Sequence, residues 1–177
     1  MVTTFRNVAT RRWQGVGLAA LLLLCSAALA VGAEGGSPVL LRVEGAVKTP
    51  LALTAEDLAK LPRTTAQFER DGETNTYEGV LLYDILMKAG IPLGKEMPGK
   101  PMASYILATA SDGYQVVFAV PEVDPAFEGA RVLVADKRDG GPLLSVQRPL
   151  QLIAPQDKLH ARSMWSLAKI EVVRLRP

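Results

Sequence analysis

Cysteine and histidine are nearly missing from this sequence of 177 residues, which contains one of each. The cysteine is Cys25, in an apolar N-terminal run, and the histidine is His160. A single cysteine forms no internal disulfide, and metal sites built from several Cys or His side chains need more such residues than this chain has. The sequence also lacks the motifs of serine hydrolases, phosphate-loop NTPases and zinc proteases.

An excess of one charge is missing too, because 20 Lys and Arg stand against 18 Asp and Glu. Three of the basic residues, Arg6, Arg11 and Arg12, precede the apolar run. Without residues 1–33 the chain has 17 basic and 18 acidic residues, a balance of −1. A nearly neutral body gives no electrostatic reason to bind nucleic acid or anionic lipid, and we expect neither as a partner.

Residues 1–33 have the pattern of a removable secretory signal peptide. Basic residues come first, an apolar stretch covers residues 18–29, and small residues suitable for cleavage follow at 28–30 or 31–33. Two alternatives remain open: a permanent anchor, because the run approaches the roughly 17 to 25 residues that span a bilayer, and a twin-arginine signal at Arg11-Arg12. We predict a periplasmic or secreted protein. It would contact the membrane only if the signal segment stays uncleaved.

The remainder of the chain is predicted to form a single domain over residues 39–177. About 144 residues remain after cleavage, and a chain of that size buries around two thirds of its unfolded surface without covalent cross-links. Cys25 would be removed with the signal peptide, so the mature chain would have no thiol for a disulfide or for metal binding.

In the first half of this domain, turn and cap residues mark the predicted elements. Thr54 with Asp57 is typical of a helix start, Asp71-Gly72 of a tight hairpin turn, and Gly90 of a helix end. The apolar pattern between them predicts strands over residues 39–43, 51–53, 64–69 and 74–80, and helices over residues 55–61 and 81–89.

In the second half, the clearest feature is a hairpin over residues 105–110 and 114–120 that turns at Asp112-Gly113. The remaining predictions are a surface loop at 91–102, a helical turn within 121–127, strands at 132–135, 150–154 and 169–176, and a turn at 137–141. Short strands with a few brief helices indicate a β-rich α+β domain.

Six sequence blocks in a fixed order cover nearly the whole of this domain: residues 41–62, 77–90, 111–114, 136–144, 148–155 and 162–172. Taken together, the set resembles the sulfite-oxidase-type molybdopterin-binding domain. The resemblance implies an α+β fold in which a mixed, twisted, β-rich sheet is wrapped by short helices.

One departure from that family affects its central chemistry. The family binds molybdenum through a cysteine thiolate in a motif close to Cys-x-Gly-Asn-Arg, whereas residues 65–72 of this chain contain no sulfur. Oxygen ligands do not replace the electron donation of a soft thiolate. We therefore predict no metal site, no catalytic residue and no bound cofactor. The alternative is a molybdopterin-dependent oxidoreductase, or its cofactor-holding subunit, whose metal is held without cysteine.

Six candidate ligand-binding residues come from the cleft or its rim. The resemblance implies that Arg148, His160 and Arg162 could hold an anionic group, and Arg70 lies where the family's metal-binding motif would be. Asp112 and Tyr114 lie at a turn that could form the rim. Each also has a simpler interpretation as a solvated charge, a turn residue or a lone surface imidazole, and Trp165 is expected in the core. The function that we predict is an exported, non-catalytic protein that binds a small ligand or a partner protein in the degenerate cofactor cleft.

Overall fold

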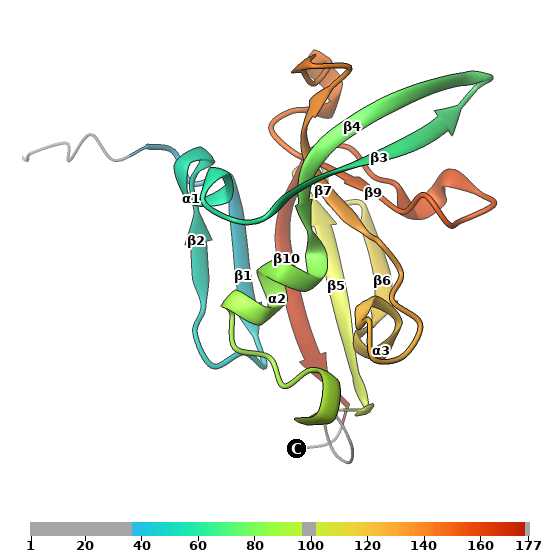
Figure 1. The fold of residues 1–177 in the computed structure, drawn as a ribbon. Coiled ribbons are helices and arrows are strands. Elements are labelled where there is room, and N and C mark those ends of the chain that lie inside the picture. Colours follow the sequence, from blue (N-terminus) through green and yellow to red (C-terminus); the bar gives the residue numbers. More distant parts are fainter. Residues whose placement is uncertain (1–36, 97–101, 176–177) are drawn as a thin grey trace, which may run out of the picture. The chain divides into compact units, whose positions relative to one another are not determined.

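The computed structural model describes residues 37–96 and 102–175. The expectations for the signal segment, for part of the 91–102 loop and for residue 176 lie outside these ranges. The described residues form an α+β domain with two sheets, as predicted (Figure 1). Among them, no helix is long and apolar enough to cross a membrane.

The first sheet is mixed. Its strands, in spatial order, are β2 (Leu51–Leu53), β1 (Leu41–Gly45), β10 (Leu167–Arg174), β5 (Ser104–Ala110) and β6 (Gln115–Ala119). β1 runs parallel to β10, and the other neighbours are antiparallel. The first and the last strands of the described chain therefore lie side by side.

The second sheet is antiparallel. It contains β3 (Arg63–Arg70), β4 (Glu73–Leu81), β7 (Leu133–Arg138) and β8 (Gly141–Pro142) in that order, with β9 (Gln151–Ile153) paired to β7. β3 and β4 form a hairpin that is drawn as a long arm in Figure 1. Gly79 lies at a register shift between β4 and β7, and a Cβ there would collide with the carbonyl oxygen of Val134.

Within the described residues, six short helices connect the strands: α1 (Ala55–Ala59), α2 (Leu82–Lys88), α3 (Val120–Val123) and the 3-10 turns η1 (Gly94–Glu96), η3 (Ser145–Gln147) and η4 (His160–Arg162). The predicted cap of α1 is confirmed. The backbone N–H of Asp57 donates to Thr54 Oγ1 at 3.2 Å, and the Asp57 carboxylate accepts from the Thr54 N–H at 3.1 Å. This hydrogen bonding lowers the pKa of Asp57.

The predicted hairpin turns are confirmed and one other turn is corrected. Asp71 and Gly72 both have positive φ, 55° and 82°, as a tight two-residue hairpin turn requires. The turn expected over residues 137–141 is shorter, because β7 continues through Arg138 and only Asp139-Gly140 makes the turn. The polar sequence concealed this extension, which pairing with β4 stabilises.

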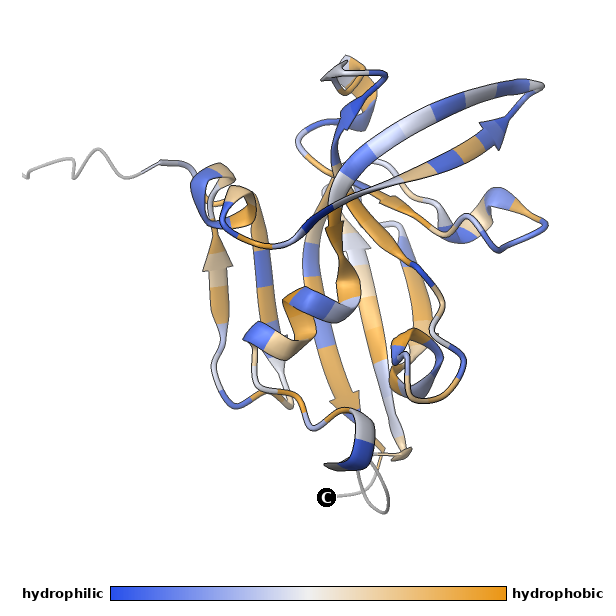
Figure 2. Cartoon of the chain, viewed as in Figure 1, coloured by the Kyte–Doolittle hydropathy of each residue, from blue (hydrophilic) through white to orange (hydrophobic). Residues whose placement is uncertain are grey.

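The main hydrophobic core lies between the two sheets and α2. The helix contributes the fully buried Leu82, Ile85 and Leu86, the first sheet contributes residues such as Phe118, and the second contributes residues such as Leu152. Figure 2 shows hydrophobic residues along the strands of the first sheet, whereas the outer half of the β3–β4 arm is mostly hydrophilic. The arm therefore contributes little to the main core.

A second, smaller cluster packs under the arm; it consists of Phe68, Tyr77, Leu133, Ala135, Leu143 and Ile153. Gln151 shares this face of the sheet, because it pairs with Ala135 in the register and alternates with Leu152. Its side chain is fully buried, and neither its amide nitrogen nor its amide oxygen has a hydrogen-bond partner among the described residues.

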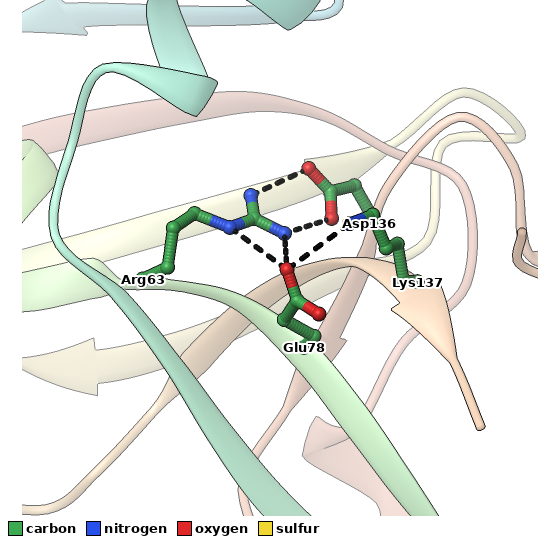
Figure 3. A network of polar contacts seen from close by, with 4 residues as sticks. All are labelled: Arg63, Glu78, Asp136 and Lys137. Carbon is green, nitrogen blue, oxygen red and sulfur yellow. Dashed lines mark hydrogen bonds and ion pairs between the residues drawn. The ribbon is translucent and has the colours of Figure 1, made fainter. Parts of the chain in front are cut away.

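A network of charged side chains ties the base of the arm to β7 (Figure 3). Arg63 donates to Asp136 at 2.6 and 2.7 Å and to Glu78 at 2.8 and 3.2 Å. Lys137 adds a second cation to Glu78 at 3.2 Å. The contacts from Arg63 and Lys137 lower the pKa of Glu78, and those from Asp136 and Glu78 raise the pKa of Arg63.

Candidate functional site

An open groove of about 260 Å³ lies where three segments meet: the end of β3, the β5–β6 turn and the segment around η4. Its lining residues are Arg70, Asp112, Tyr114, His160, Ala161, Ser163, Met164 and Trp165. Four of the six candidates chosen from the sequence are therefore brought together, although they are far apart along the chain.

Arg70 is held in place by the segment around η4. Its Nη2 donates to the carbonyl oxygens of His160 at 3.3 Å and of Ser163 at 3.0 Å. The guanidinium carbon lies 5.2 Å from the centroid of the Trp165 ring and 5.7 Å from that of Phe68. Within the described residues, no acidic side chain pairs with Arg70, and its Nε and Nη1 make no hydrogen bond. The groove thus presents a fixed cation with unused donors.

Asp112 and Tyr114 form the facing side of the groove. Asp112 Oδ1 accepts the backbone N–H of Tyr114 at 2.9 Å, and the Tyr114 hydroxyl donates to the carbonyl oxygen of Ala161 at 2.8 Å. The backbone N–H of Ser111 donates to the carbonyl oxygen of Ser166 at 2.9 Å. These bonds fix the β5–β6 turn against the η4 segment, and no cation pairs with Asp112 in the described part of the chain.

His160 connects the groove to the small cluster under the arm. Its ring meets the Phe68 ring edge to face, with the centroids 4.9 Å apart, and its side chain is half-buried. Phe68 itself packs edge to face on Tyr77 with the centroids 6.2 Å apart. The interpretation of His160 as an isolated surface residue therefore does not describe its surroundings.

Arg162 lies outside the lining of the groove. Its guanidinium contacts Asp157 at 2.7 and 2.8 Å and Glu122 at 2.9 Å, and it lies 4.4 Å from the centroid of the Phe118 ring. Asp157 first and Glu122 second raise the pKa of Arg162 above its ordinary value. Arg162 is therefore a structural link between η4, α3 and β6, with its charge already matched.

Arg148 is also separate from the groove. Its side chain is exposed, and its Nε donates to the carbonyl oxygen of Leu143 at 2.9 Å. Neither Arg148 nor Arg162 adds a free charge to the lining. The structure therefore separates Arg148 and Arg162 from the four candidates that line the groove.

Trp165 corrects an expectation, since it lines the groove with 42% of its surface exposed instead of lying in the core. The preceding residue, Met164, takes the buried position at 3% exposure, and Ser166 follows with a φ of 51°. The chain bends at Trp165 and Ser166, so Met164 and Trp165 face different ways. No local pattern marks Trp165 as the exposed member of the pair, because Ser163 on its other side is buried too, at 3% exposure.

The groove residues do not fit a molybdenum atom held through a cysteine thiolate. The segment that corresponds to the family's cysteine motif is regular strand, paired to β4 from Arg63 to Arg70. The groove lining contains a thioether, Met164, but no thiol. In the described ranges no three metal-ligating His, Cys, Asp or Glu side chains gather at one place.

A second cavity, of about 330 Å³, lies beside α3 and is mostly apolar. It is lined by Leu81, Tyr83, Val123, Pro125, Gly129, Ala130 and Arg131. Arg131 donates from Nη2 to Thr64 Oγ1 at 2.9 Å, so one of its hydrogen-bond donors is already occupied within the fold. Fewer polar groups converge there than in the groove, which makes the groove the stronger candidate.

Comparison with known proteins gives a fold but no family assignment. No family model and no curated protein matches the chain. Among solved structures, the sulfane dehydrogenase SoxCD from Paracoccus pantotrophus is similar, with a TM-score of 0.59 and 20% sequence identity. The match covers 77% of this chain and 39% of that chain, so the present domain corresponds to well under half of the larger protein. The chain therefore has a distant sulfite-oxidase-like fold.

Proposed function

We propose that this chain is an exported, non-catalytic binding protein that holds a small ligand in the groove formed by Arg70, Asp112, Tyr114 and His160. The observation that carries the proposal is the meeting of these four residues in one lining. They were selected from the sequence as positions of a former cofactor cleft. The sulfite-oxidase-like fold agrees with this interpretation only as an analogy, since one fold hosts many functions and the site must carry the argument.

The polar groups of the groove are fixed before any ligand arrives. Arg70 is anchored by two backbone carbonyls, and the β5–β6 turn is anchored through Tyr114 and Ser111. Groups that are ordered in the free protein lose little conformational entropy on binding. The residues thus supply orientation and charge to a ligand. Binding of this kind requires no bond to be broken.

A segment of a periplasmic partner protein is the second occupant that the groove would accept. Three large apolar side chains near it are exposed: Tyr114 at 49%, Trp165 at 42% and Leu159 at 80%. Exposed aromatic rings at the edge of a polar site are common in protein interfaces. A partner would cover these rings, whereas a small ligand would leave Leu159 exposed.

The first test separates this proposal from the oxidoreductase alternative. The full chain is expressed in a host that makes molybdenum cofactor, purified from the periplasm, and analysed for molybdenum and for released pterin. We expect a folded protein in the periplasm without stoichiometric metal or pterin. One molybdenum per chain, or a protein that stays in the membrane with residues 1–33 attached, would overturn the corresponding part of the proposal.

The second test addresses the groove directly. A library of small metabolites is screened by NMR shift perturbation, and hits are titrated against the wild type, Arg70→Ala and Arg174→Ala. Arg174 is exposed at the end of β10 and outside the groove lining, so it controls for the loss of one charge. We expect Arg70→Ala to weaken binding at least about tenfold, equivalent to about 1.4 kcal/mol, and Arg174→Ala to leave it unchanged. Equal effects would remove the groove as the site.

A further inference from the structure

The groove contains two charges of opposite sign that do not neutralise each other. Arg70 and Asp112 both line it, yet they form no ion pair within 4.0 Å, and neither pairs with another charged side chain among the described residues. The other half-buried cations, such as Arg63 and Arg162, have carboxylate partners. Arg70 is half-buried without one among the described residues, and Asp112 is exposed at its turn.

Both charged groups have polar atoms that are free to form hydrogen bonds with a ligand. Arg70 keeps its Nε and Nη1 donors, because the contacts to the backbone use Nη2. Asp112 keeps Oδ2, because the contact to Tyr114 uses Oδ1. Each group is therefore oriented through one of its polar atoms and keeps at least one other polar atom free for a ligand.

Three of the other six lining residues of the groove are aromatic. Trp165 and Tyr114 are about half exposed, and His160 is half-buried. A ligand body that is flat or apolar gains contact area there, and one with a cationic group gains from the ring faces as well.

From this arrangement we infer that the groove binds a small zwitterion: a molecule with a carboxylate for Arg70, an ammonium group for Asp112, and an apolar or aromatic body between the rings. Free amino acids and short peptides share this chemistry and differ in the separation of their charges. The inference rests on the proposed binding function and specifies its ligand.

The test removes one ligand charge at a time. Phenylalanine carries both charges, N-acetylphenylalanine lacks the ammonium group, and phenylalanine amide lacks the carboxylate. Alanylphenylalanine keeps both charges at a greater separation, so its affinity relative to phenylalanine distinguishes a peptide from a free amino acid. Binding is measured by calorimetry and by fluorescence in the Trp13→Phe chain, where Trp165 is the only tryptophan. We expect at least one zwitterion to bind about tenfold or more tightly than either of its singly charged analogues.

Matched protein variants assign each ligand charge to a residue. Asp112→Asn keeps the Oδ1 acceptor for Tyr114 and removes the charge, so the preference for phenylalanine over N-acetylphenylalanine should disappear. Arg70→Gln should remove the preference over the amide. Asp139→Asn changes another Asp-Gly turn whose carboxylate accepts a backbone N–H, and it should leave both preferences intact.

Two outcomes overturn the zwitterion inference. One is that N-acetylphenylalanine or phosphate binds to the wild type as tightly as the zwitterions do. The other is that Asp112→Asn keeps the preference for phenylalanine over N-acetylphenylalanine. Either outcome would leave the broader binding proposal standing. The first would make the ligand an anion, and the second would assign recognition of the ammonium group to a residue other than Asp112. If Arg70→Gln fails to fold, the Asp112→Asn comparison still decides the question, since that variant keeps the turn contact.

Discussion

The main core and the arm are stabilised by different means. The main core joins both sheets and α2 through fully buried aliphatic and aromatic side chains, whereas the arm rests on a six-residue cluster and on the Arg63 network. Hydrophobic burial is insensitive to pH, while ionic contacts at half-exposed positions are sensitive to pH and salt. The groove lies at the outer end of the arm, so the candidate site belongs to the region with the smaller core.

The largest expected effect tests the main core. Leu86→Ala removes a fully buried side chain of α2 and should lower the free energy of unfolding by about 3 kcal/mol. Met87→Ala, one position along the same helix, changes a side chain that is 49% exposed and should cost about 0.5 kcal/mol or less. Urea unfolding of both variants measures the difference, and equal losses would contradict the assignment of α2 to the core.

The second effect tests the arm. Arg63→Gln leaves Asp136 and Glu78 without their shared partner, so we expect a loss of about 2 kcal/mol. The loss should appear as faster hydrogen exchange in β3 and β4, while exchange in β5 stays slow. Arg131→Gln is the control, since Arg131 is exposed and makes one hydrogen bond, to Thr64. Uniformly faster exchange would show that the arm and the main core unfold as one unit.

A smaller effect, of opposite sign, is expected at Gln151. Its buried amide has no partner among the described residues, so Gln151→Met should raise the free energy of unfolding by about 1 kcal/mol. Gln147→Met is the matched control, because Gln147 is 4% exposed and its Oε1 accepts the backbone N–H of Leu144 at 3.1 Å. That control should be destabilised. A loss of stability in Gln151→Met would indicate that the buried amide has a partner, such as a water molecule.

The smallest effect is the pH dependence of the arm. The folded pKa of Glu78 is lowered by Arg63 first and Lys137 second, so its contribution is complete above the ordinary pKa of about 4.3 and falls as the pH drops below it. Glu78→Gln should therefore flatten the decline of stability in acid. Burial raises the pKa of Asp84, which acts in the opposite direction, so the variant is compared with the wild type at each pH. An unchanged acid limb would contradict the proposed role of Glu78.

Local sequence signals predicted the local structure well. The Asp71-Gly72 and Asp112-Gly113 turns and the Thr54 cap were predictable because their causes lie within four neighbouring residues. The extension of β7 through Arg138 was missed because pairing with β4 stabilises it, and such pairing leaves no mark in a polar sequence. The fold class was predictable from the pattern and from the resemblance, and the structure confirms it.

The candidate site likewise combines residues that the sequence pointed to with contacts that only the structure shows. Arg70 was chosen for its place in the family motif, but its contacts with His160 and Ser163 depend on a packing of the arm that the sequence does not encode locally. Arg162 was selected by residue type, and only the structure shows that Asp157 and Glu122 already match its charge. A list of charged residues does not say which of them are already paired.

The parallel pairing of β1 with β10 has a consequence for the route to the native state. Arg42 pairs in register with Lys169, so the middle of the first sheet joins segments from opposite ends of the domain. Contacts between such distant segments impose a large loop-closure cost and slow the search for the native topology. During synthesis, β1 cannot pair with β10 until nearly all of the described domain has been made.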